Sequence, residues 1–60
     1  MEYQKMDKVL VVDDEKSIRL TLSEFLDVEG YKVDLAADFW KAKEFLKNNS
    51  YDAFIFDIVL

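Results

Sequence analysis

The sequence contains no cysteine, histidine or proline, and its one glycine is Gly30. Without cysteine and histidine the chain has no ordinary zinc site, and without histidine it supplies neither a histidine-based catalytic triad nor a phosphohistidine. A single glycine excludes a glycine-rich loop that cradles the phosphates of a nucleotide. The lack of cysteine also means that no disulfide stabilises the fold, which fits a reducing compartment.

Long apolar runs are absent as well. No stretch approaches the roughly 20 residues that a membrane span needs, and the N-terminus has no apolar core of a signal peptide. The formal net charge of −5 argues against nucleic acid or an anionic membrane as a direct partner. We therefore expect a cytoplasmic location. The 60 residues, 52% of them hydrophobic, indicate one small folded domain.

The apolar pattern predicts alternating strands and helices. Residues 9–12 and 53–56 are apolar without alternation, as in strands that are covered on both faces. Between them, apolar residues recur at helical spacing. The expected elements are strands at 8–13, 31–35 and 52–57 and helices at 15–29 and 38–47. This β-α-β-α-β order is typical of a parallel α/β sheet.

Local signals mark the helix ends and the inward faces. Asp14 and Asp38 are the expected N-caps, and Gly30 is the expected left-handed residue after the first helix. The residues expected to face inward are Ile18, Leu22, Phe25 and Leu26 in the first helix and Phe39, Ala42, Phe45 and Leu46 in the second.

Acidic residues follow the first and third strands. Asp13 and Asp14 end the stretch VLVVDDE, and Asp57 ends the apolar run at 53–56. Because parallel strands point their carboxyl ends the same way, these acids should meet at one edge of the sheet, where doubly wound folds carry their sites. Carboxylates about 5 Å apart repel by roughly 3 kcal/mol at an effective dielectric constant near 20. A Mg²⁺ ion would offset this repulsion, and the remaining acid could act as a nucleophile.

Simpler readings stand beside this one. Asp13, Asp14 and Glu15 could cap the first helix and complement its dipole, and Asp57 could be an ordinary loop acid. A Mg²⁺-dependent phosphohydrolase with an Asp nucleophile is disfavoured, since its signature separates two Asp residues by one position and here they are adjacent. The combination of all three acids favours the convergent site over the separate readings.

The segments VLVVDDE and YDAFIFDIVL resemble the N-terminal half of a response-regulator receiver domain of two-component signalling, over nearly all of residues 8–60. The resemblance implies a flavodoxin-like, doubly wound parallel sheet with strand order 2-1-3. It implies that Asp57 is the phosphoacceptor, and that Asp13, Asp14, Asp57 and the backbone carbonyl of Val59 hold Mg²⁺. The implied donor is a phosphohistidine on a sensor histidine kinase or a phosphotransfer protein. No turnover of an external substrate is expected.

The sequence also departs from this family. The family's hydroxyl residue of strand four and lysine of strand five have no counterpart in residues 1–60, so the chain reads as a truncated receiver that could be inactive alone. Lys16 is more simply a solvated charge than a substitute for that lysine. Phe39 stands where the family often has glycine, so Phe39 and Trp40 form an unusual aromatic pair, either core or a partner surface.

Truncation leaves the third strand as an open edge in this reading. An exposed apolar edge is a template for pairing, so two chains could join their third strands as a homodimer. The alternative function is a non-phosphorylated interaction or self-association module that uses this edge. Binding of Mg²⁺ would separate the two functions, because an interaction module has no need of it.

Overall fold

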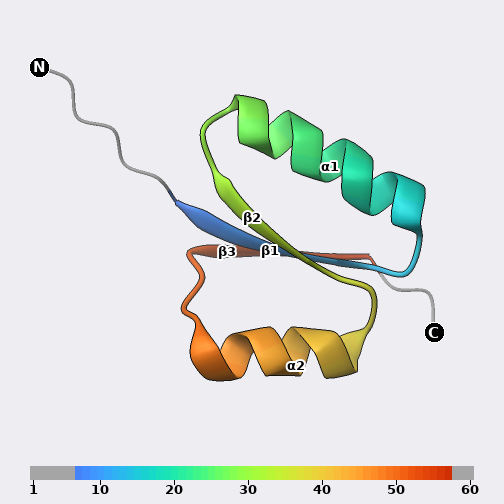
Figure 1. Cartoon of the computed structure of the whole chain (residues 1–60), viewed down its shortest axis with the longest axis vertical. Helices are drawn as coiled ribbons and strands as arrows, with labels where there is room; N and C mark the ends of the chain where they lie inside the picture. The colour runs from blue at the N-terminus through green and yellow to red at the C-terminus, as the bar shows by residue number, and fades with distance from the viewer. Residues whose placement is uncertain (1–6, 58–60) are drawn as a thin grey trace, which may run out of the picture.

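The computed structural model describes residues 7–57, which form a three-stranded parallel sheet with a helix on each face (Figure 1). The elements in chain order are β1 (Lys8–Asp13), α1 (Lys16–Val28), β2 (Lys32–Ala36), α2 (Phe39–Asn48) and β3 (Ala53–Asp57). The strand order is β2-β1-β3, which confirms the α/β fold class and the predicted order. Each boundary lies within one residue of its predicted position. None of the helices in this part of the chain is long and apolar enough to cross a membrane.

The core surrounds the central strand β1. Residues 9–13 are all buried, as the unbroken apolar run predicts for a strand with neighbours on both edges and a helix on each face. Leu10 and Val12 pack with Ala36 of β2 and Ala42 of α2 in one buried cluster. Since successive side chains of a strand alternate between its faces, Val9, Val11 and Asp13 point toward the other face, which α1 covers.

The start of α1 corrects one prediction. Its N-cap is Glu15, whose side chain makes no capping hydrogen bond, and Asp14 does not cap the helix. The carboxylate of Asp13 reaches past Asp14 instead, and its Oδ1 accepts a hydrogen bond of 2.9 Å from the backbone N–H of Glu15. The acid that ends β1 therefore also fixes the turn into α1.

The other predicted helix ends are confirmed. Gly30 has φ +95°, and the N–H groups of Gly30 and Tyr31 donate to the carbonyls of Asp27 and Leu26, each at 3.0 Å. This is the pairing of a Schellman motif, in which glycine avoids the strain of a left-handed residue. At the start of α2 the Asp38 side chain accepts from the N–H of Lys41 at 2.9 Å, as an N-cap should.

The inward faces of the helices are narrower than predicted. Both helices contact β1 and β2 and neither packs its backbone against β3. Ala42 is buried, and Leu22, Leu26 and Phe45 are partly buried. The expectation of burial was wrong for Ile18, Phe25, Phe39 and Leu46, which are exposed. Helical spacing gives the direction of a side chain but not whether a neighbour covers it.

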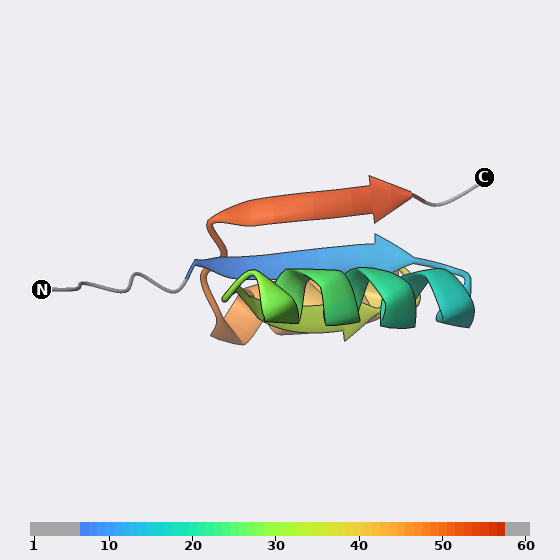
Figure 2. The same ribbon diagram turned by 90° about the horizontal axis from the view of Figure 1, so that it is seen from above.

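Strand β3 is an edge of the sheet, and the backbone of neither helix lies against it (Figure 2). Among the described residues no strand pairs with its outer side. The rings of Phe54 and Phe56 stack, with 5.9 Å between their centroids. The ring of Phe39 lies 6.3 Å from that of Phe56, and the ring of Tyr51 lies 6.0 Å from that of Phe54. The predicted open edge is therefore present, with a row of half-exposed aromatic rings along it.

Candidate functional site

Two acids meet at the carboxyl end of the sheet. Asp13 and Asp57 are paired residues in the parallel β1–β3 ladder, and each is the last residue of its strand. Paired residues of neighbouring strands lie about 4.8 Å apart and point their side chains to the same face. The predicted convergence of these two acids is therefore present in the backbone register.

Asp13 is an unusual acid because it is almost completely buried, with 2% of its surface exposed. Its Oδ1 accepts the N–H of Glu15, whereas its Oδ2 is buried and has no hydrogen-bond partner among residues 7–57. An unpaired, buried carboxylate oxygen is costly unless a cation or a donor compensates it. This oxygen therefore marks a position that a cation would stabilise.

Arg19 is a neighbour of this site that the sequence analysis missed. Its Nη1 donates a hydrogen bond of 2.8 Å to the backbone carbonyl of Asp13. The end of β1 is thus held twice by the start of α1, through the carbonyl by Arg19 and through Oδ1 by Glu15. The one signal in the sequence for this contact was the position of Arg19, a basic residue one turn into the helix that follows the acids.

The remaining predicted site residues are less closely gathered. Asp14 and Asp57 are exposed, and within residues 7–57 no three acidic side chains form a group that could hold a metal ion by themselves. Val59 lies outside the described residues. Lys16 is exposed and forms no ion pair with another described residue, so nothing places its ammonium group at the acids.

The residues that are present fit a hard divalent cation better than any softer metal. They offer only oxygen atoms, one of them buried and unpaired. Mg²⁺ is commonly held by one or two carboxylates and keeps several waters, so it does not require three protein carboxylates. The exposed carboxylate of Asp57, on the open strand, remains accessible to a reactant.

The opposite end of the sheet is held by a polar cluster that the sequence analysis also missed. The hydroxyl of Tyr51 donates to Asp34 Oδ2 at 2.6 Å, and Lys8 Nζ donates to Asn49 Oδ1 at 2.8 Å. Partial burial, together with the hydrogen bond to Asp34 and its charge, raises the pKa of Tyr51 to about 12. This cluster ties the segment before β3 to the starts of β1 and β2.

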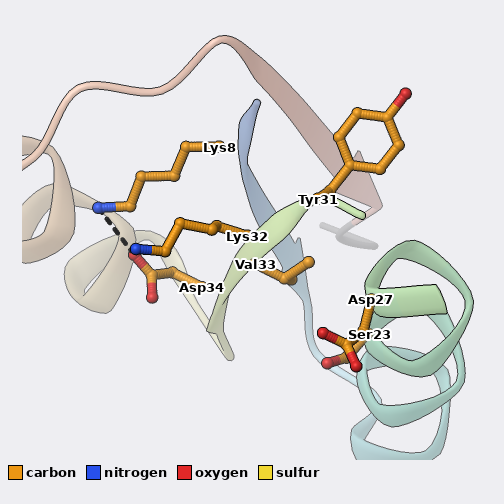
Figure 3. Close-up of a pocket in the computed structure, with 7 residues that line it drawn as sticks. All are labelled: Lys8, Ser23, Asp27, Tyr31, Lys32, Val33 and Asp34. Carbon is orange, nitrogen blue, oxygen red and sulfur yellow. Dashed lines mark ion pairs between the residues drawn. The ribbon is translucent and has the colours of Figure 1, made fainter. Parts of the chain in front are cut away.

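A hollow of about 440 Å³ lies near this cluster (Figure 3), and neither Asp13 nor Asp57 lines it. It opens between the start of the sheet and the second half of α1, and Lys8 forms an ion pair of 3.8 Å with Asp34 beside it. The lining residues are Lys8, Ser23, Asp27, Tyr31, Lys32, Val33 and Asp34. Positive and negative side chains balance within it, so it has no clear preference for a charged ligand.

Comparison with known proteins agrees with the geometry at the carboxyl end of the sheet. Residues 9–60 match the family model of the response regulator receiver domain. The chain is 38% identical over 53 residues to the response regulator MprA of Mycobacterium sp. (strain KMS), 36% to that of Mycobacterium ulcerans (strain Agy99) and 34% to that of Mycobacterium tuberculosis (strain ATCC 25177 / H37Ra).

These alignments cover 88% of this chain but only 23% of each relative, so the chain spans about a quarter of the length of the curated proteins it matches. No solved structure matches it significantly. The family match covers most of the chain and includes both strands that end in the paired acids. The chain therefore belongs to the response regulator receiver domain family.

Proposed function

We propose that this chain is the phosphoacceptor part of a two-component response regulator and that Asp57 receives the phosphoryl group. The observation that carries the proposal is the pairing of Asp57 with Asp13, whose buried Oδ2 has no partner among the described residues. A nucleophilic carboxylate beside a cation-binding carboxylate is the arrangement that an aspartyl-phosphate requires.

In this proposal the residues have separate roles. An oxygen of Asp57 forms a bond to the phosphorus while the P–N bond of the donor phosphohistidine breaks. The electron pair of the P–N bond leaves with the imidazole, which then takes a proton from solvent. Asp13, Asp14 and Asp57, with the carbonyl of Val59, would hold Mg²⁺. When bound, Mg²⁺ neutralises charge on the transferring phosphoryl group. Arg19 and the Glu15 N–H keep Asp13 in place.

The proposed partner is a sensor histidine kinase or a phosphotransfer protein, in the cytoplasm. This chain contains no histidine, so the phosphohistidine must come from that partner. Modification of its own Asp57 would be the whole reaction, with no turnover of an external substrate. Pairing of two chains through β3 remains a separate prediction.

Intact mass spectrometry after incubation with acetyl phosphate and Mg²⁺ tests the proposal. We expect a gain of one phosphoryl group, removed by hydroxylamine because an acyl phosphate is labile to it and a phosphoserine is not. Asp57→Asn should abolish the gain, whereas Asp27→Asn, a matched change at an exposed acid of α1, should leave it intact. A gain that survives Asp57→Asn would contradict the assignment, whereas no gain in the parent chain would show that residues 1–60 do not carry out the phosphorylation by themselves.

Calorimetric titration with Mg²⁺ tests the metal ligands separately. Removal of a group that holds a metal in place usually lowers affinity by about tenfold or more. We expect losses of that size in Asp13→Asn and in Asp14→Ala, and little change in Asp27→Asn. An unchanged affinity in both of the first two variants would exclude them as ligands.

A further inference from the structure

The outer face of α2 carries a surface that the phosphoacceptor function does not use. Trp40 is the one tryptophan of the chain, and 75% of its surface is exposed. Lys43 and Lys47 follow it at positions i+3 and i+7, so the three side chains form one stripe along the helix. Trp40, Lys43, Glu44 and Lys47 line a shallow hollow of about 310 Å³. We call these four residues the Trp40 surface.

The charge of this surface is opposite to that of the chain. The net charge is −5, yet three of the eight basic residues lie in α2 with a single acid, Glu44. Glu44 is already engaged, since Lys41 Nζ lies 3.4 Å from its Oε1. No carboxylate among the described residues pairs with Lys43 or Lys47. Two ammonium groups are therefore available beside an exposed indole ring.

The indole ring also contacts one of these two lysines. Lys43 Nζ lies over the Trp40 ring, 5.5 Å from its centroid, and such a cation–π contact at an exposed site weakly favours this arrangement. Exposed tryptophans with basic neighbours are common energetic centres of protein interfaces, because the ring offers a large area at a small entropic cost. Such an arrangement favours a ligand with carboxylates next to an apolar side chain.

We propose that the Trp40 surface binds an acidic segment of a partner protein, with its carboxylates at Lys43 and Lys47 and an apolar side chain on Trp40. A membrane fits less well, since a helix that lies on a lipid surface needs a continuous apolar face. In α2 Ala42 and Phe45 turn toward the sheet. The exposed apolar residues Phe39, Trp40 and Leu46 do not form a continuous face, because at helical spacing Lys43 and Lys47 lie between them. Nucleic acid fits less well because two unpaired lysines offer few phosphate contacts and the net charge repels a polyanion.

Trp40 provides its own fluorescent reporter, because no second tryptophan obscures it. The 60-residue chain is titrated with a short acetylated peptide in which glutamate and leucine alternate. We expect the emission of Trp40 to shift to shorter wavelengths and to saturate, with weaker binding at higher salt. A peptide with glutamine in place of glutamate should bind at least about fivefold more weakly.

Variants with the same net charge distinguish binding at the Trp40 surface from nonspecific electrostatic attraction. The double variant Lys43→Gln with Lys47→Gln should lower the affinity for the peptide by about fivefold. The double variant Lys16→Gln with Lys32→Gln removes the same charge elsewhere and should change the affinity by less than about twofold. Circular dichroism of each variant checks that the fold is kept. The proposal fails if the peptide leaves Trp40 unchanged or if both double variants weaken binding equally. It also fails if vesicles of anionic phospholipid, or a single-stranded oligonucleotide, shift the emission at lower concentration than the peptide.

Discussion

Asp13 and Asp57 end neighbouring parallel strands at paired positions, and one of them is buried while the other is exposed. The burial of Asp13 follows from the central place of β1 in the sheet, whereas the exposure of Asp57 follows from the edge position of β3. The pair thus combines a fixed carboxylate with an accessible one.

Two carboxylates this close should destabilise the metal-free chain. We expect Asp57→Asn to raise the free energy of unfolding by about 1 kcal/mol without Mg²⁺, because solvent at the exposed Asp57 screens much of the repulsion. Saturating Mg²⁺ should remove most of that difference by stabilising the parent chain. Urea unfolding with and without Mg²⁺ measures both values. Equal stability of the parent and the variant in both conditions would show that the acids do not interact.

The two helices begin differently, and their first turns should respond differently to mutation. Asp38→Ala removes the side chain that accepts the N–H of Lys41 and should cost about 1 kcal/mol of unfolding free energy. Glu15→Ala removes no capping bond and should change stability by less than about 0.5 kcal/mol. Urea unfolding of both variants makes the comparison, and a similar loss in each would contradict it.

Ionisation of Tyr51 should lower the free energy of unfolding as the pH rises in the alkaline range. Partial burial, followed by the hydrogen bond to Asp34 and its charge, raises its pKa from 10.0 to about 12. Because the folded-state pKa is the higher one, this contribution is fully present below pH 10 and is lost as the pH rises toward 12. Tyr51→Phe lacks this titration. The parent chain should therefore lose more stability than Tyr51→Phe between these pH values, and equal losses would exclude the Asp34 contact.

The open edge of β3 predicts self-association at high concentration. Phe54 and Phe25 are both exposed phenylalanines, but only Phe54 lies on the edge strand. Lysine on an edge strand opposes pairing with another edge. In analytical ultracentrifugation we expect Phe54→Lys to lower the fraction of dimer and Phe25→Lys to leave it unchanged. A parent chain that stays monomeric at high concentration would exclude the pairing.

The sequence predicted the elements and the meeting of Asp13 with Asp57, because unbroken apolar runs and parallel strand ends constrain the backbone strongly. It did not predict the contact of Arg19 with the Asp13 carbonyl, since the reach of a long side chain is not set by spacing. Phe25 and Phe39 were wrongly placed in the core for a related reason. Their burial depends on which surfaces have a neighbour, and the backbones of both helices lie against β1 and β2 but not against β3.

The position of β1 has a further consequence for local opening of the fold. Its backbone is paired on both sides, to β2 and to β3, whereas within residues 7–57 each of those strands is paired on one side only. Amide hydrogens of the central strand should therefore exchange with solvent deuterium more slowly than those of the edge strands, which open in smaller fluctuations. By this argument Asp13 would belong to the slowly exchanging strand and Asp57 to a faster one. The buried carboxylate of Asp13 would thus stay in place while the edge strand that carries Asp57 opens and closes.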